Sequence, residues 1–460
     1  MNGKDGKSEH FLLNRRRLLG GAALGLGALP LISPSQLFAA NAGTIGAAEA
    51  MAMAEARRGE LVELLSRLIR VQSLSGEAGD VAQGIVTDYL AKLPYDVQAS
   101  RYRPSDYTGH AEYMPPNPPG DGPFTNVVAR PTESGSRHAL FAHIDTHRVE
   151  DGWTTDPYEP VLRDGRLYGL GTSDDKGGIA AMLIAAAVLS EKPGLAPVLI
   201  SSHGKGGGSR GSLPVFQAMQ DAGESIDALL YVHPAETGRG LADIKHVVRG
   251  ALDFELSVTG WEGDPLEIGL PDSALWKEGG DALARLSAII EHLRAGVLAG
   301  VDMNVGRLEA GERPGGVPAR ASARIRLLFD GDYTWRGLMD RVSRELENDA
   351  GPEQAGRNAY TVTAEPLGMR SNPGAVPWDA RSTITLRDAI TSVTGKAPAS
   401  YPNHYGGDIR YPLRLLGAPS FGIGSLGGNF YGPNEWVDVD DLVRLVAVLI
   451  LTLSGWQAVG

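Results

Sequence analysis

The sequence predicts an α/β protein with a mixed, largely parallel sheet and a smaller α+β unit inserted into it. Short apolar, strand-like runs alternate with helical segments along most of the chain, which is the pattern of a layered fold with a buried sheet. Between residues 250 and 365 the pattern changes to alternating strand-like runs around two amphipathic helices, which indicates the insertion. The 460 residues suffice for two or three domains.

The larger unit is expected to comprise residues 47–249 and 366–460. Helical periodicity runs over 47–70, and a segment rich in Pro, Gly and Tyr at 102–124 is expected to form a long surface loop. Strands are expected at 126–130, 138–142, 197–202 and 228–232, and helices at 177–190, 212–222 and 441–453.

The inserted unit is expected over residues 250–365. Its strands are expected at 252–258 and 321–329, and its helices at 280–296 and 335–348. Two amphipathic helices bracketed by half-buried strands predict a small α+β sandwich.

Residues 1–42 are expected to be an export signal rather than part of the fold. The run Asn14-Arg15-Arg16-Arg17-Leu18-Leu19 resembles a twin-arginine signal, and Ala40-Asn41-Ala42 fits a cleavage site. A membrane anchor is the alternative, but the apolar stretch is shorter than the roughly 20 residues that a spanning helix needs. We therefore expect a periplasmic or secreted protein with no membrane association once the signal is removed.

The amino-acid composition excludes several kinds of catalytic group, metal ligand and binding partner. The chain has no cysteine, which excludes disulfides, thiolate catalysis and cysteine-ligated metals. Its formal net charge of -12 gives no electrostatic case for nucleic acid or anionic lipid as a partner. Any metal ion must therefore be bound by His, Asp, Glu or backbone oxygen.

A histidine and an aspartate follow the strand expected at 138–142. His143 stands just past the end of that strand, and Asp145 is placed two residues later, where it could orient the imidazole. Carboxyl ends of strands carry functional groups in open α/β sheets, and a histidine held by a carboxylate is a recurrent metal ligand. On its own, this pair is a weak signal.

Further short motifs follow in a fixed order. They occupy residues 152–157, 163–169, 171–178, 258–260, 304–306, 317–318, 323–326, 406–408 and 433–437. Together with His143-Ile144-Asp145-Thr146, they resemble the dinuclear-zinc hydrolase family of acetylornithine deacetylase, succinyl-diaminopimelate desuccinylase, aminoacylase, carnosinase and carboxypeptidase G. The resemblance covers residues 55–456, nearly all of the chain that follows the export signal.

The resemblance implies a two-domain zinc hydrolase in which the insertion is a lid that often dimerises, so a homodimer through the lid is an expectation. It implies two zinc ions that share one aspartate, a glutamate as general base, and small peptides or N-acyl amino acids as substrates. His143 and Asp174 match the first ligand and the shared aspartate, and Asp145 matches the residue that orients His143.

The sequence departs from that pattern at several positions. The general-base glutamate falls on Lys205, and a ligand glutamate falls on Gly206, which has no side chain to bind a metal. The ligand acid before a proline has become His233, and the final ligand histidine has become Tyr431. A lid histidine that would fall near Asp264 is absent.

These changes affect the two metal sites unequally. One site loses both of its own ligands, at Gly206 and Tyr431. The other keeps His143 and Asp174 and gains His233, a three-ligand set that suits one zinc ion with an open position. We expect one zinc ion or, if these side chains are hydrogen bonded in a metal-free pocket, none.

The glycine-rich segment admits three interpretations. Residues 206–211 fit a G-x-G-x-x-G loop that would bind an anion with help from Lys205 and Arg210. Ser209 fits a nucleophile elbow, but it lies well beyond the strand that it should follow directly. The interpretation we favour is a flexible loop left after the glutamates were lost.

Candidate substrate-binding residues are Arg326, Asp408 and Tyr431, which correspond to positions in or near the active cleft of the family. For Arg326 and Asp408, a buried ion pair is the alternative.

Three functional hypotheses follow. The first is an exported hydrolase of an amide or peptide-like bond that uses one metal ion, with Lys205 or His203 as proton carrier. The second is a catalytically silent relative that binds a peptide or acyl-amino acid. The third is different chemistry in which Lys205 is a base or a covalent amine.

Overall fold

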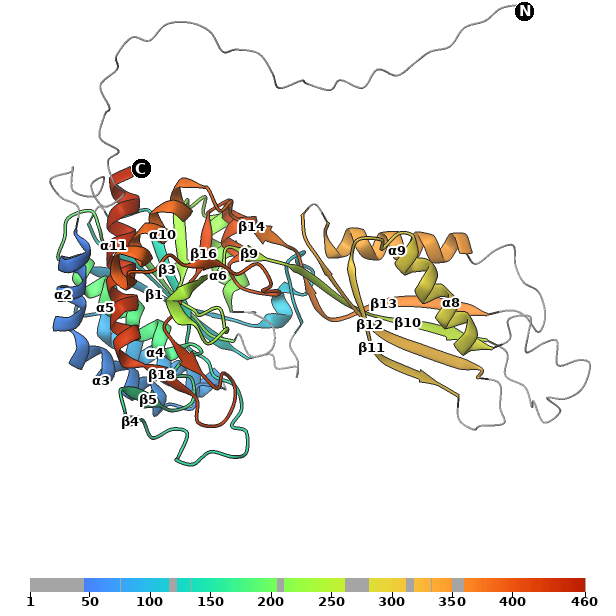
Figure 1. Ribbon diagram of the computed structural model, residues 1–460, viewed down its shortest axis with the longest axis horizontal. Coiled ribbons are helices and arrows are strands. Elements are labelled where there is room, and N and C mark those ends of the chain that lie inside the picture. Colours follow the sequence, from blue (N-terminus) through green and yellow to red (C-terminus); the bar gives the residue numbers. More distant parts are fainter. Residues whose placement is uncertain are drawn as a thin grey trace, which may run out of the picture.

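The computed structural model describes residues 45–74, 76–115, 122–133, 135–204, 211–260, 281–311, 318–331, 333–349 and 360–459. The expected export signal lies outside these ranges, as do Lys205, Gly206, Ser209, Arg210 and Asp264. The described chain forms two units, each with its own sheet and its own apolar core (Figure 1).

The larger unit is built on a six-stranded sheet with the order β1-β2-β6-β3-β7-β16. Pairing is parallel from β6 to β16 and antiparallel between β1, β2 and β6. The strands are β1 (Tyr95–Tyr102), β2 (Phe124–Pro131), β3 (His138–His143), β6 (Val198–Ser202), β7 (Ala228–Tyr231) and β16 (Ser420–Gly422). This mixed, largely parallel sheet confirms the fold class predicted from the sequence.

Helices cover both faces of this sheet because alternate residues of a strand point to opposite faces. On β3, Leu140 and Ala142 join the core on one face, whereas Ala139 and Phe141 join the core on the other. The first face is covered by α2 (Ala47–Ala56), α3 (Arg58–Ile69), α4 (Gly76–Leu90), α5 (Lys176–Ser190), α10 (Arg381–Thr394) and α11 (Val439–Val459). The second is covered by α6 (Ser212–Asp221) and a π-helical turn at Pro412–Leu416.

The helix α5 is buried along almost its whole length, between the sheet and α11. Its sequence is apolar on every side, which is typical of a helix inside a protein. Over the described residues, no helix combines the length and the apolar character needed to cross a bilayer.

Short strands complete the larger unit. A four-stranded sheet contains β4 (Val161–Arg163), β5 (Arg166–Tyr168), β17 (Gly427–Gly428) and β18 (Trp436–Asp438). Two further pairs join β8 (Asp243–Ile244) to β15 (Ala399–Ser400) and β9 (Val247–Val248) to β14 (Gly374–Ala375).

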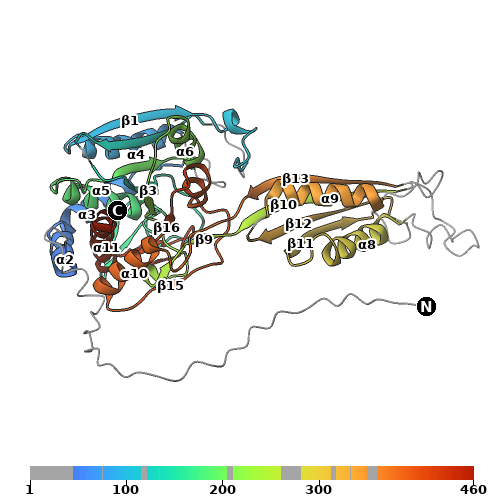
Figure 2. The same ribbon diagram turned by 90° about the horizontal axis from the view of Figure 1, so that it is seen from above.

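The second unit is a four-stranded antiparallel sheet with two helices on one face (Figure 2). Its order is β11 (Asp302–Ala310), β12 (Arg320–Phe329), β10 (Gly250–Thr259) and β13 (Thr361–Ser371), and its helices are α8 (Ala282–Ala295) and α9 (Trp335–Asp349). Buried and partly exposed residues alternate along β10, so one face of the sheet packs on the helices. The strand β13 continues past residue 365, where the insertion was expected to end.

The segment between β1 and β2 differs from the surface loop that the sequence predicted. Its described part begins with a 3-10 helix at Pro104–Tyr107, and Tyr113 is buried in the second core. Glu112 is buried with two partners: it pairs with the guanidinium of Arg414, and it accepts a hydrogen bond from Asn372 (2.8 Å), which in turn accepts one from the backbone of Trp335 (3.0 Å). Local composition cannot show these partners, since they lie more than 200 residues away in the chain.

Gly178 lies in the first turn of α5, where the helix closely approaches the end of β7. A substitution at this position tests that close approach. A Cβ atom at Gly178 would lie 2.0 Å from the Val232 carbonyl oxygen, so Gly178→Ala should lower the free energy of unfolding by about 1–3 kcal/mol. Gly84 in α4 is the matched control, because an added Cβ meets nothing within 4 Å. Gly84→Ala should be neutral or stabilising by up to about 1 kcal/mol. Urea unfolding measures both, and a Gly178→Ala protein of unchanged stability would contradict this packing.

Candidate metal centre

Two neighbouring parallel strands end at the candidate site. β3 ends with His143, and β7 is followed by Val232 and His233. Because parallel strands end on the same edge of a sheet, both imidazoles lie at the edge where α/β proteins place functional groups. Asp174 reaches the same edge from the turn that precedes α5.

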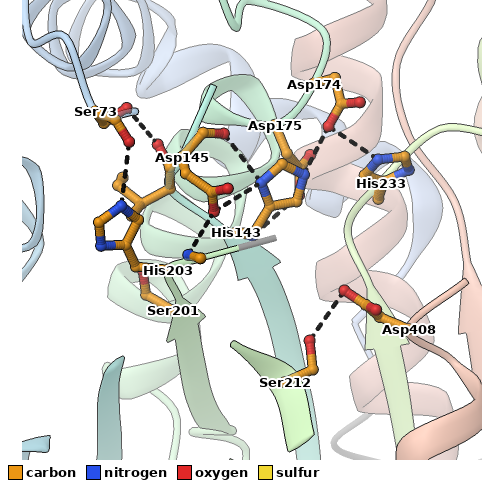
Figure 3. A network of polar contacts seen from close by, with 12 residues as sticks. Ser73, His143, Asp145, Asp174, Asp175, Ser201, His203, Ser212, His233 and Asp408 are labelled. Atoms are coloured by element: carbon orange, nitrogen blue, oxygen red, sulfur yellow. Dashed lines mark hydrogen bonds and ion pairs between the residues drawn. The ribbon is translucent and has the colours of Figure 1, made fainter. Parts of the chain in front are cut away.

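The carboxylate of Asp174 contacts both imidazoles (Figure 3). Its Oδ1 is 2.6 Å from His143 Nε2 and 3.0 Å from His233 Nε2. All three side chains are buried, and one ligand atom of each lies within 4.8 Å of the other two. Across the described ranges, this is the one group of three or more histidine or acidic side chains with that spacing.

Asp145 supplies two acceptor oxygens to one ring nitrogen of His143. His143 Nδ1 lies 3.1 Å from the Asp145 backbone carbonyl oxygen and 3.6 Å from its carboxylate Oδ1. Both oxygens are acceptors, so Nδ1 would keep its proton if Nε2, which faces Asp174 Oδ1, bound a metal ion. The backbone N–H of His143 donates to Asp175 Oδ2 (3.2 Å), which ties the strand end to the turn before α5.

His233 is held from its other side by a residue that the sequence analysis missed. Lys245 is fully buried next to β8, and its Nζ lies 2.7 Å from His233 Nδ1. The Pro234 carbonyl oxygen is 2.9 Å from the same nitrogen, and the Tyr231 ring stacks on the imidazole with centroids 4.8 Å apart. Nothing in the local pattern around Lys245 signals this partner, because the contact depends on how two loops fold together.

Glu435 secures the turn that carries Asp174. Its buried carboxylate accepts hydrogen bonds from the backbone N–H groups of Gly171 (2.8 Å), Ser173 (2.8 Å) and Asp174 (3.0 Å). Burial raises the pKa of Glu435 to about 8, while these N–H donors act in the opposite direction. The motif at 433–437 marked this residue in the sequence but did not show its supporting role.

Lys176, the first residue of α5, is buried near the carboxylates of Glu435 and Asp145. Its Nζ donates a hydrogen bond to the Val71 carbonyl oxygen (2.7 Å). Burial lowers the pKa of Lys176 to about 7, and the charges of Glu435 and Asp145 act in the opposite direction.

A cavity of about 370 Å³ lies beside His233. Tyr431, at the position of the expected ligand histidine, lines this cavity, and Asp408 lines it too. Burial raises the pKa of the Tyr431 phenol well above its ordinary value, and the carboxylates of Asp174 and Glu236 add to that effect. Sequence analysis did not single out Glu236, which lies 3.9 Å from His233 Nε2 through its Oε1.

His203 does not join the cluster. It is buried, and its Nε2 faces the Ser73 carbonyl oxygen at 3.2 Å rather than Asp174 (Figure 3). The ring of Phe124 meets the imidazole edge-on with centroids 5.0 Å apart. Its Nδ1 is buried without a hydrogen-bond partner among the described residues, and its role as proton carrier stays a prediction.

Arg326 also lies apart from the three ligand candidates. Its guanidinium pairs with Asp253 through hydrogen bonds of 2.6 and 2.7 Å, so an ion pair is present, but it is partly exposed rather than buried as the alternative had it. Arg326 lines a second cavity, of about 700 Å³, on the sheet of the inserted unit. Asp408 is not in such a pair and accepts a hydrogen bond from the Ser212 hydroxyl (2.9 Å).

Comparison with known proteins gives one family and a consistent fold. The model of "Peptidase family M20/M25/M40" matches residues 139–454. A succinyl-diaminopimelate desuccinylase of Rhodospirillum centenum is 28% identical over 357 residues, which cover 75% of this chain and 88% of the relative. A succinyl-diaminopimelate desuccinylase of Rhizorhabdus wittichii is 29% identical over 334 residues, which cover 71% of this chain and 84% of the relative.

Solved structures share the fold at low sequence identity. Aminopeptidase PepT of Bacillus cereus has a TM-score of 0.64 at 16% identity, covering 87% of this chain and 99% of that one. A dinuclear metal binding peptidase of Bacillus subtilis has a TM-score of 0.59 at 15% identity, and the match covers 88% of this chain and 99% of that one. Human carnosine dipeptidase 1 has a TM-score of 0.59 at 15% identity, covering 89% and 98%.

The buried amine of Lys176 should make stability rise with pH. In the unfolded chain the lysine keeps its proton up to its ordinary pKa of 10.5, whereas in the folded protein it releases the proton above about 7. The unfolded state therefore binds more protons in this window, and the free energy of unfolding increases with pH. Urea unfolding at pH 7 and at a pH about two units higher should show a larger gain for the wild-type protein than for Lys176→Met. Equal gains would contradict this burial.

Proposed function

The chain belongs to peptidase family M20/M25/M40, and from this we propose that it hydrolyses an amide or peptide-like bond with a single zinc ion. The observation that carries the proposal is the buried group of His143, Asp174 and His233, with ligand atoms within 4.8 Å of one another. The succinyl-diaminopimelate desuccinylases and the dipeptidase to which the chain is similar support small peptides or acyl-amino acids as the substrate class.

The residues present fit one ion better than two. Two imidazoles and one carboxylate are a common donor set for zinc in hydrolases. At the second metal site of the family pattern, Gly206 offers no side-chain donor, and the Tyr431 phenol is hydrogen bonded to the carboxylates of Asp174 and Glu236. When bound, one ion supplies a Lewis acid that polarises the carbonyl of the substrate.

Residues of this chain prepare the site for that ion. Asp145 accepts at Nδ1 of His143, which leaves Nε2 as the nitrogen that would bind the ion beside Asp174. Glu435 fixes the turn that carries Asp174. The cavity beside His233, about 370 Å³, falls in the size range of small-molecule sites and can hold a short peptide or acyl-amino acid.

For the proton carrier we propose Lys205, because it stands at the general-base position of the family pattern. A lysine accepts a proton only in its neutral form, so this role requires surroundings that lower its pKa. A Lys205→Ala variant that keeps full hydrolytic activity would exclude it.

We also propose that the chain is exported by the twin-arginine route and is periplasmic or secreted. The support is the sequence of residues 14–19 and the cleavage motif at 40–42. A homodimer through the inserted unit remains a proposal as well, and it rests on the family resemblance alone.

Hydrolysis should depend on the metal and on Asp174. The protein, purified without chelator or a histidine tag, should cleave members of a panel of dipeptides and N-acyl amino acids, and a chelator should abolish this activity until zinc is restored. Asp174→Asn should lower kcat/KM by at least roughly 100-fold, since loss of even an outer-shell partner of a zinc ligand costs 10–100-fold. His292→Ala, which removes an exposed histidine of α8, is the matched control and should be unaffected.

Other outcomes separate the remaining hypotheses. If the protein binds members of the panel but cleaves none of them, it is a catalytically silent binding protein rather than a hydrolase. If cleavage survives chelation but is lost in the Lys205→Ala variant, the reaction depends on Lys205 rather than on a metal ion. If the Lys205→Glu, Gly206→Glu double variant gains hydrolysis, the natural chain is a weakened form of the family enzyme rather than a remodelled one.

Export should be visible in the mature N-terminus. Mass spectrometry of the periplasmic or secreted fraction from a bacterial host should find the chain beginning at Gly43, directly after the cleavage motif. Replacing Arg15, Arg16 and Arg17 with lysine should leave the full-length precursor inside the cell. An unprocessed chain in the cytoplasm of cells producing the natural sequence would contradict export.

A further inference from the structure

We propose that Glu112 is a positioning residue, which fixes the inserted unit against the larger unit so that both cavities form one preformed substrate cleft. Glu112 lies in residues 103–115, a segment that follows β1 and is called the strap below. None of the motifs that carry the family resemblance falls in the strap. The inference rests on the proposed function for the nature of the substrate, but its first test is a distance between the two units.

The two units are joined by two stretches of chain that lie side by side. β10 begins the inserted sheet at Gly250, β13 ends it at Ser371, and Ala251 pairs with Ser371 (Figure 2). Two adjacent connections keep the units together but leave a rotation about themselves, as in hinges at the ends of elements. A third attachment is needed to fix the angle between the units.

The strap supplies that third attachment because it is anchored in both units. Tyr113 belongs to the apolar core on the second face of the larger sheet. On the other side, the indole Nε1–H of Trp335 donates a hydrogen bond to the Ala111 carbonyl oxygen (2.9 Å), and Trp335 belongs to the core of the inserted unit. Side chains in close-packed cores have few alternative positions, so both anchors resist displacement.

Glu112 connects the two units between these anchors. Its Oε1 accepts hydrogen bonds from the guanidinium of Arg414 (2.5 Å), in the larger unit, and from Asn372 Nδ2 (2.8 Å), directly after β13. Asn372 Oδ1 in turn accepts the backbone N–H of Trp335 at the start of α9 (3.0 Å). Glu112 is buried, and a buried carboxylate that loses its partners is costly. These residues therefore favour the one arrangement of the units in which all of the contacts form.

This arrangement determines how the two cavities meet. Met114 follows the anchored Tyr113 and lines both cavities, as does Met369 of β13. One part of the shared wall is thus carried by the strap and the other by the inserted unit. Because a rotation of the inserted unit would separate these two side chains, a fixed angle keeps the cleft in its binding shape and lowers the ordering cost of binding.

The first test measures the distance between the units by pulsed electron paramagnetic resonance. The chain has no cysteine, so Asp88→Cys in α4 and Ala288→Cys in α8, both exposed, place one spin label on each unit. The labelled protein that keeps Glu112 should give one narrow distance distribution. Glu112→Ala removes both contacts of Oε1 and should broaden the distribution or add a second maximum. Trp335→Phe removes the bond to Ala111 and should broaden it less.

The second test separates positioning from a merely structural role. If Glu112→Ala leaves about one tenth of the molecules in the binding-competent arrangement, the apparent affinity falls about tenfold. KM for the panel member that is cleaved best should rise by that factor, whereas kcat should change by less than about twofold, because bound substrate restores the arrangement. Glu112→Gln keeps an oxygen that can accept from both partners and should recover most of the affinity.

Glu224→Gln is the matched control. Glu224 pairs with Arg130 (2.6 Å) within the larger unit, so this change weakens an ion pair without touching the junction of the units. Its distance distribution and its KM should equal those of the protein with natural Glu224.

Three results would overturn the inference. They are a broad or multiple distance distribution in the protein that keeps Glu112, a distribution that both Glu112→Ala and Trp335→Phe leave unchanged, and a Glu112→Ala protein with unchanged KM. If Glu112→Ala does not fold, Trp335→Phe decides, because its ring still fills the core. Failure of the proposed function is a separate result, since a protein that cleaves no member of the panel can still show the fixed distance and its loss in the variants.

Discussion

The carboxylate of Asp174, shared by two buried imidazoles, is the interaction on which the rest of the site depends. A charge at this depth is costly unless every partner is fixed in place. The neighbouring residues supply that restraint: Asp145 orients His143, Lys245 and Pro234 contact His233, and Glu435 holds the turn of Asp174 itself. The three side chains of this cluster are therefore held in place by their neighbours in the folded chain.

The architecture explains why these side chains meet. Parallel pairing of β3 with β7 brings His143 and His233 to the same edge of the sheet, and the close approach of α5 to Val232 brings Asp174 onto that edge. The buried segment around Glu112 connects the larger unit to the inserted sheet through Asn372. Both cavities are lined by Met114 and Met369.

The fold was largely predictable because its elements have strong local signals. The strand at His138–His143 and the apolar helix α5 follow from hydrophobic pattern alone, and the motifs around His143 and Asp174 follow from their order in the chain. Lys245 and Glu236 could not be predicted, because their importance arises only when separate loops fold against His233. Glu112 was expected on the surface because it lies in a polar loop. Such a residue is buried only if partners far away in the chain form hydrogen bonds or ion pairs with it, and the local sequence does not show these partners.

We propose that this chain holds one metal ion where the pattern of the family implies two. The most direct measurement is anomalous diffraction at the zinc edge from crystals of the mature protein grown with zinc and without chelator. The account predicts one peak, about 2.0–2.2 Å from Nε2 of His143, Nε2 of His233 and a carboxylate oxygen of Asp174. Two peaks that share Asp174, or no peak with the imidazoles still hydrogen bonded to that carboxylate, would contradict it.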